Sequence, residues 1–178
     1  MANLILSVIG SDRPGLTQAL ARAVLSAGGN WLQSHLSRLG GLYVGSVLVE
    51  LDAERIEALR AAVREVDAQG LEVRIAAALE ASGPAAGAAG EAVDLALVGQ
   101  DRPGIVQQVT ARLSSLGANI ETFDTRLSVE PHSGAPLFRL QARLRLPAGL
   151  TAQAVQAALE DISAEIMVDI TLSPAAED

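Results

Sequence analysis

The sequence of 178 residues contains no cysteine and no lysine. Without cysteine there is no thiol nucleophile, no disulfide and no zinc site built on thiolates. All 13 basic residues are arginine, which excludes catalysis through a lysine Schiff base or a P-loop lysine. No cluster with metal-ligand spacing stands out either. We therefore expect a protein without catalytic residues, metal or cofactor.

Aromatic residues are also scarce, at 2% of the chain, whereas hydrophobic residues make up 49%. The core must be built from Leu, Val, Ile and Ala, and there is no aromatic surface on which bases could stack. The net charge of −8 is shared by two halves that are each negative, so neither half can neutralise a phosphate backbone. We expect no direct binding to nucleic acid.

Long apolar runs are absent as well. No stretch approaches the roughly 18 to 20 uncharged apolar residues that a membrane-spanning helix needs. The first residues, Met1 to Leu4, lack the basic region of a signal peptide. The expected location is the cytoplasm, with no membrane partner.

What the sequence does contain is a repeat. Residues 10–18, GSDRPGLTQ, return as residues 99–107, GQDRPGIVQ, with a displacement of 89. The same displacement carries residues 28–31 onto 117–120. A repeat of this length exceeds one unit of a solenoid or propeller. The chain is therefore predicted to be one small domain written twice.

The two domains are predicted at residues 1–80 and 92–174, with a linker at 81–91 and a tail at 175–178. Residues 81–90 are rich in Ala and Gly and carry neither charge nor a large apolar side chain, which is typical of a linker. Each domain has about 80 residues, which is enough for a modest core.

Hydrophobic periodicity predicts the same order of elements in both domains. In the first, strands are expected at 4–9, 31–38, 42–51 and 71–75, and helices at 14–27 and 56–66. In the second, strands are expected at 93–98, 119–128, 137–146 and 165–172, and helices at 103–116 and 151–162, with Thr151 as an N-cap. The βαββαβ order predicts an α+β, ferredoxin-like domain: a four-stranded antiparallel sheet with two helices on one face.

The repeated turn predicts a small binding site. A proline at the first helical position would leave the next N–H groups, those of Gly15 and Leu16, free to receive a carboxylate at the positive end of the helix. The neighbouring Asp12 could attract an ammonium group, so the turn suits a zwitterionic amino acid. The alternative is that Asp12 caps the helix while Pro14 and Gly15 only shape a tight turn.

The Asp-Arg-Pro-Gly turn between strand and helix, followed by Gly-x-Asn at the next strand, resembles the ACT domain, an amino-acid-sensing module. The tandem arrangement and the segments 28–35 and 39–41 resemble the glycine cleavage system transcriptional repressor family. The resemblance implies a regulator rather than an enzyme, with pairing of ACT domains in a homodimer. It also implies a small amino acid such as glycine as ligand and a transcription factor as protein partner.

Carried over by position, the resemblance implies two equivalent sets of ligand-binding residues. They are Asp12, Arg13, Pro14, Gly15, Leu16 and Asn30 in the first domain, and Asp101, Arg102, Pro103, Gly104, Ile105 and Asn119 in the second. Serine-binding ACT domains commonly have Asn in place of Asp12 and His in place of Gly10. These differences set the chain apart from serine-type recognition.

A second candidate surface lies on the strand predicted at 137–146. Arg139, Arg143 and Arg145 alternate with apolar residues, so they share one face of that strand. They predict either a docking surface for an acidic partner or a solvated face with cross-strand pairs.

Together these features favour a non-catalytic regulator in which two ACT domains respond to an amino acid. The expected role is that of a transcriptional repressor acting through a protein partner. The alternative is an ACT interaction module that binds no ligand and regulates a metabolic enzyme.

Overall fold

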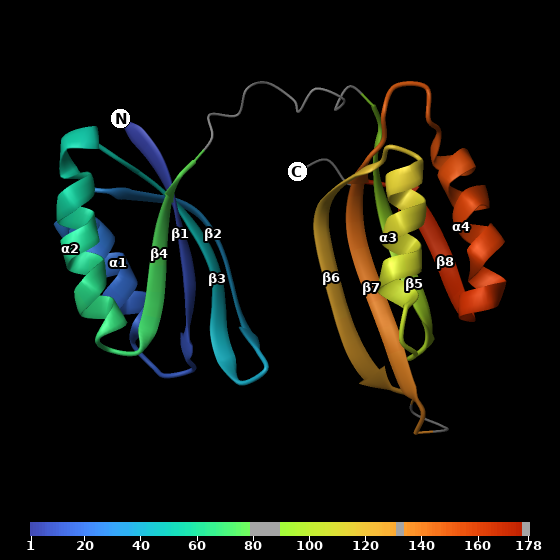
Figure 1. Ribbon diagram of the computed structural model, residues 1–178, viewed down its shortest axis with the longest axis horizontal. Helices are drawn as coiled ribbons and strands as arrows, with labels where there is room; N and C mark the ends of the chain where they lie inside the picture. Colours follow the sequence, from blue (N-terminus) through green and yellow to red (C-terminus); the bar gives the residue numbers. More distant parts are fainter. Residues whose placement is uncertain (79–89, 131–133, 176–178) are drawn as a thin grey trace. The chain divides into compact units, whose positions relative to one another are not determined.

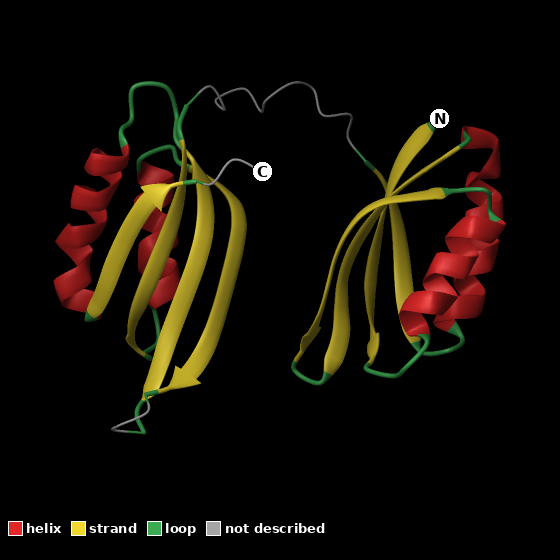
Figure 2. Ribbon diagram, turned by 180° about the vertical axis from the view of Figure 1, so that it is seen from behind, coloured by secondary structure: helices red, strands yellow, loops and turns green. Residues whose placement is uncertain are grey.

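The computed structural model describes residues 1–78, 90–130 and 134–175. The chain divides into two compact units, Met1–Ser82 and Gly83–Asp178. Each unit is a four-stranded antiparallel sheet with two helices against one face, and the other face of the sheet carries no helix (Figures 1 and 2). The predicted α+β class and the βαββαβ order are confirmed in both domains.

The first domain has the sheet order β2-β3-β1-β4. Its elements are β1 (Ala2–Ser11), α1 (Leu16–Ser26), β2 (Asn30–Leu39), β3 (Leu42–Leu51), α2 (Ile56–Asp67) and β4 (Leu71–Ala77), with one short 3₁₀ turn (Ala53–Arg55) before α2. The chain crosses from β1 through α1 to the edge strand β2, and β3 then returns to pair with β1.

The second domain repeats this topology with the sheet order β6-β7-β5-β8. Its elements are β5 (Ala92–Gln100), α3 (Ile105–Ser115), β6 (Asn119–Val129), β7 (Pro136–Arg145), α4 (Ala152–Ile166) and β8 (Val168–Pro174). Thr151 caps α4 as predicted, because its side chain accepts a hydrogen bond from the backbone N–H of Ala154 at 3.2 Å.

Each domain has a core of its own between sheet and helices. On β1, the residues Leu4, Leu6 and Val8 are buried, whereas their neighbours in between are exposed. Leu20 on α1 and its counterpart Val109 on α3 are fully buried against the sheet. This alternation is the period of two that lets a strand bury one face and expose the other.

Two predicted boundaries are wrong at the starts of α1 and α3. The helices begin at Leu16 and Ile105, not at Pro14 and Pro103. The glycines in between, Gly15 and Gly104, adopt left-handed backbone conformations with φ of 94° and 98°, which no right-handed helix contains. Each proline therefore belongs to a turn that precedes the helix, and the glycine forms the N-cap.

The last strand of the second domain also begins later than predicted, at Val168. Helix α4 continues to Ile166, and the left-handed residue Met167 turns the chain into the strand. Most of the predicted linker at 81–91 and of the predicted tail at 175–178 lies outside the described residues.

Candidate functional site

The candidate site is the loop that joins the first strand of each domain to its first helix. In the first domain it follows Ser11, the last residue of β1, which pairs with Leu42 beside the turn between β2 and β3. Residues 12–15 are exposed to solvent, as are Asp101, Pro103 and Gly104 in the second domain. The loop is therefore accessible in both copies.

The helix that follows each loop is not capped by a side chain. The N-caps are Gly15 and Gly104, which have no side chain to accept a hydrogen bond. The Asp12 side chain is directed to Arg38 of β2, so within the described residues it does not cap the helix as the alternative predicted. The first N–H groups of an α-helix have no acceptor within the helix. Both helix starts thus present backbone donors and a partial positive charge at an exposed turn.

Leu16 and Ile105 are buried, unlike most of the other residues predicted to bind the ligand. The two residues are only 5% and 2% exposed and pack in the two cores. They anchor the helix start to the sheet, so their side chains are not open to a ligand.

The side chains of the first loop are engaged within their own domain. Asp12 forms an ion pair with Arg38 of β2 at 3.1 Å, and Arg13 donates hydrogen bonds to Ser11 Oγ at 3.0 Å and to the carbonyl oxygen of Gln69. An exposed ion pair such as the first contributes about 0–1 kcal/mol. Arg13 thereby ties the loop to the turn between α2 and β4.

The second loop has no such contacts in the part of the chain that the structure describes. Asp101 forms no ion pair there, and the Nε atom of Arg102 is buried without a hydrogen-bond partner. A cavity of about 410 Å³ opens beside Gly99 and Gln100, the two residues before this loop. Two loops with nearly the same sequence therefore differ in how their side chains are used.

Gly10 and Gly99 are structural residues whose role the sequence did not reveal. A side chain at Gly10 would collide with the carbonyl oxygen of Gly70, and one at Gly99 would collide with that of Met167. The strand end and the facing turn approach too closely for any residue but glycine. The sequence signal for this role was that both glycines recur at the displacement of 89. The close contact with the facing backbone also explains why neither position can hold a histidine.

Asn30 and Asn119 are not brought to the loop of their own domain. Asn30 begins β2 and pairs with Glu50, whereas Ser11, at the loop, pairs with Leu42 at the other end of β3. Asn119 likewise pairs with Arg145 at the far end of β7 from its loop. Both asparagines are exposed, and helix α1 or α3 separates each from the loop.

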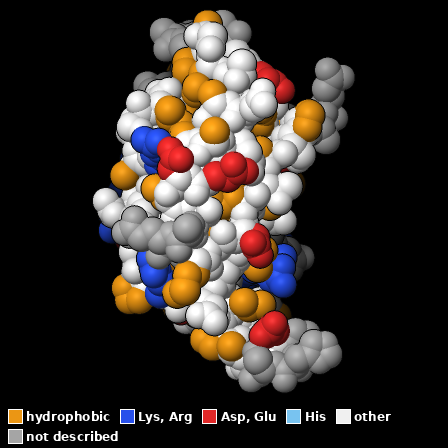
Figure 3. Space-filling view, turned by 90° about the vertical axis from the view of Figure 1, so that its right-hand side faces the viewer, with side chains coloured by type: hydrophobic (Ala, Val, Ile, Leu, Met, Phe, Trp, Pro, Cys, Tyr) orange, Lys and Arg blue, Asp and Glu red, His pale blue; other side chains and the backbone are white. Residues whose placement is uncertain are grey.

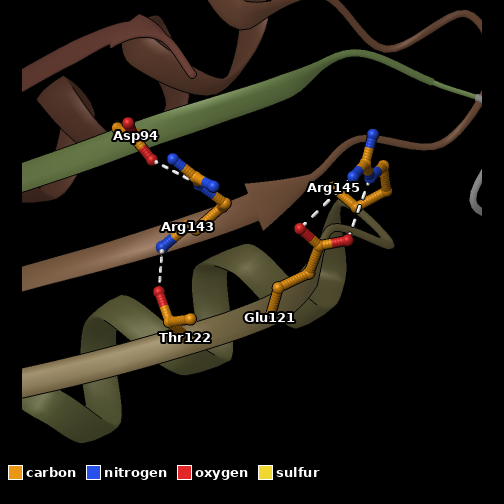
Figure 4. Close-up of polar contacts among 5 residues, drawn as sticks. All are labelled: Asp94, Glu121, Thr122, Arg143 and Arg145. Atoms are coloured by element: carbon orange, nitrogen blue, oxygen red, sulfur yellow. Dashed lines mark hydrogen bonds and ion pairs between the residues drawn. The ribbon is translucent and has the colours of Figure 1, made fainter. Parts of the chain in front are cut away.

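The three arginines of β7 have partners within their own sheet, and Figure 4 shows two of them, Arg143 and Arg145. The guanidinium of Arg143 contacts Asp94 of β5 at 3.1 Å, and that of Arg145 contacts Glu121 of β6 at 2.9 Å. Arg139 donates to Ser128 Oγ at 3.1 Å. The structure thus supports the interpretation of a solvated face with cross-strand pairs, because acidic neighbours neutralise two of the three charges.

The described residues contain neither a metal-binding cluster nor a helix suited to cross a membrane. Acidic and basic side chains are dispersed over the face drawn in Figure 3. Residues 1–78, 90–130 and 134–175 hold no group of three or more His, Asp or Glu side chains placed to bind a metal. None of their helices is both long and apolar enough to cross a membrane.

Comparison with known proteins identifies the first domain. Residues 2–76 match the family model of the ACT domain. A protein from Galdieria sulphuraria, described only as unknown, is 31% identical and superposes with a TM-score of 0.83, covering 98% of this chain and 99% of its own. No curated protein matches in sequence.

A second solved structure shares the whole architecture. It is described as a candidate glycine cleavage system transcriptional repressor and superposes with a TM-score of 0.69. The alignment covers 99% of this chain and 98% of that one, at 15% sequence identity. At this identity the likeness concerns the fold, with two domains in tandem in both proteins.

Proposed function

We propose that the chain, whose residues 2–76 match the ACT-domain family, is a non-catalytic regulator that responds to a small amino acid. The proposed role is that of a repressor of the glycine cleavage type, which acts through a transcription-factor partner. The tandem fold shared with the candidate glycine cleavage repressor supports this role.

The observation that carries the proposal is the exposed turn before each helix start, present twice and in both cases without a side-chain cap among the described residues. Left-handed glycines place it directly after the Asp-Arg-Pro turn. Backbone N–H groups at the positive end of a helix bind carboxylates without a basic side chain. An aspartate in the same turn, Asp12 or Asp101, offers a carboxylate for the ammonium group of the ligand.

Regulation requires that the ligand distinguish two states of the protein. An amino acid bound to this loop can change contacts with a partner only if it binds one state more tightly than the other. A coupling of about 1–3 kcal/mol is typical and changes partner affinity by about 5- to 150-fold. One short loop with a few directed hydrogen bonds is sufficient for an effect of this size.

The proposal is tested by thermal unfolding of the full chain against all twenty amino acids. A ligand at about 100 times its Kd stabilises the native state by roughly 2.7 kcal/mol, which raises the Tm of a chain of this size by several degrees. We expect stabilisation by glycine or another small amino acid. Equal Tm values across the panel would contradict an amino-acid sensor.

The second candidate is an interaction module that binds no ligand. The engaged side chains of the first loop favour it, because Asp12 and Arg13 show that this turn can serve folding alone. It predicts that no amino acid raises the Tm while a partner protein still binds. The same unfolding panel therefore separates the two candidates.

A further inference from the structure

We infer that the two loops have taken unequal roles: the first serves the fold of its domain, and the second receives the amino acid. This inference rests on the proposed function and assigns it to one of the two copies. The two loops differ in the ion pairs and hydrogen bonds that hold their side chains.

Three contacts hold the first loop and helix start, and we call them the first-loop contacts. They are the ion pair between Asp12 and Arg38, the hydrogen bonds from Arg13 to Ser11 and the Gln69 carbonyl, and the hydrogen bond between Thr17 and Tyr43 at 2.8 Å. They tie the loop to β2, to the turn before β4 and to β3. Its charged groups therefore already have partners inside the domain.

The second domain lacks the residues for two of these contacts. Arg38 lies opposite Tyr43 in the first sheet, and at the equivalent place in the second sheet Leu127 lies opposite Phe138. Leu127 cannot pair with Asp101, and Phe138 has no hydroxyl group. Val106 stands where Thr17 stands in the first helix, so the third contact has lost both of its polar groups.

The arginines of the two loops also differ in their hydrogen bonds: Arg13 has partners in its own domain, whereas the Nε atom of Arg102 has none among the described residues. Ser11, which accepts a hydrogen bond from Arg13, is replaced by Gln100. The Nε atom of Arg102 is buried and has no partner among the described residues. A buried donor without an acceptor destabilises the protein that contains it. Because the Nε atom is enclosed while the Arg102 side chain is only half-buried, a ligand carboxylate would supply the missing acceptor once that side chain turns outward.

The energetic consequence favours the second loop as the binding site. A ligand at the first loop must compete with the first-loop contacts for Asp12 and Arg13. At the second loop, Asp101 has no ion pair among the described residues that a ligand would have to break. An anionic ligand would also remove the energetic cost of the unpaired Nε donor of Arg102.

The inference is tested on the full chain by NMR titration with glycine, following the backbone amides of Gly15 and Gly104. We expect the Gly104 amide to shift in a saturable manner and the Gly15 amide to stay in place. Saturable shifts at Gly15, alone or together with Gly104, would overturn the unequal roles and leave the proposed function intact. If neither amide shifts and no amino acid raises the Tm, the proposed function fails and the inference fails with it.

Matched variants supply a test that does not depend on the ligand alone. Arg102→Leu removes the unpaired donor, so it should leave the Tm unchanged or higher while weakening glycine binding about tenfold or more, as expected for loss of a charge-assisted hydrogen bond. Arg13→Leu is the control: it should lower the Tm and leave glycine affinity unchanged. The opposite pattern, with Arg13→Leu abolishing binding, would refute the assignment.

Discussion

At the scale of single residues, glycines shape the candidate site in two distinct ways. Gly10 and Gly99 are required because another chain segment lies against them. Gly15 and Gly104 have open space around the position of a side chain, and their backbone φ is what favours glycine. The two cases predict different responses to the same substitution.

Gly10→Ala should destabilise the first domain by about 1–3 kcal/mol, because the added methyl group overlaps the backbone oxygen of Gly70 and either the strand end or the facing turn must move. Urea denaturation of the full chain measures the loss. Ser7→Ala, at an exposed position of the same strand, is the control and should change stability by less than about 0.5 kcal/mol. Equal free energies of unfolding for the two variants would show that the end of β1 can move away from Gly70 without loss of stability.

Gly104→Ala should cost about 1–2 kcal/mol, which is the penalty for a side chain in the left-handed region without any collision. Gly104→Asn should recover part of this loss, since Asn tolerates that region better than Ala. The two free energies of unfolding, determined by urea denaturation, check the ranking. A larger loss for Asn than for Ala would contradict a purely conformational origin.

At the scale of secondary structure elements, local sequence signals located the helices and strands but missed several of their ends. The proline of each turn is a strong helix-start signal, yet the left-handed glycine that follows it delays each helix by two residues. Alternation predicted correctly that the three arginines of β7 share a face. It could not show that Asp94 and Glu121, on neighbouring strands, are their partners.

The pair formed by Glu121 and Arg145 makes the pairing of β6 and β7 testable. Both side chains are about one-third exposed, so reversing either charge should cost about 1 kcal/mol. Exchanging the two residues, as Glu121→Arg with Arg145→Glu, should recover most of that loss. A double-mutant cycle by chemical denaturation measures the coupling, and zero coupling would mean that the ion pair contributes nothing to the sheet.

At the scale of the whole molecule, a duplicated sequence produces two domains with one topology and separate cores. Duplication sets the number of loops at two, but it does not make them equivalent. The first-loop contacts exist only where Arg38, Thr17 and Tyr43 are present. The chain therefore combines a symmetric fold with asymmetric side chains.

This asymmetry predicts the stoichiometry of ligand binding. Isothermal titration calorimetry with glycine should give one binding site per chain, because the first-loop contacts engage the charged side chains of the first loop. Introducing Leu127→Arg together with Val106→Thr and Phe138→Tyr would rebuild two of the first-loop contacts in the second domain and should weaken that site. Two equal sites per chain would contradict the prediction.

The sequence by itself determined the duplication, the βαββαβ order and the face that the three arginines of β7 share. These properties repeat at fixed spacings along the chain, because side-chain periodicity reflects local backbone geometry. Only the tertiary structure decided which of the repeated residues have partners within their own domain and which are open to a ligand. Asn30 lies at the far end of its sheet and Gly10 lies against Gly70. Arg13 reaches Gln69, while the Nε atom of Arg102 has no hydrogen-bond partner among the described residues. Such contacts join segments distant in the chain, and no local pattern encodes them.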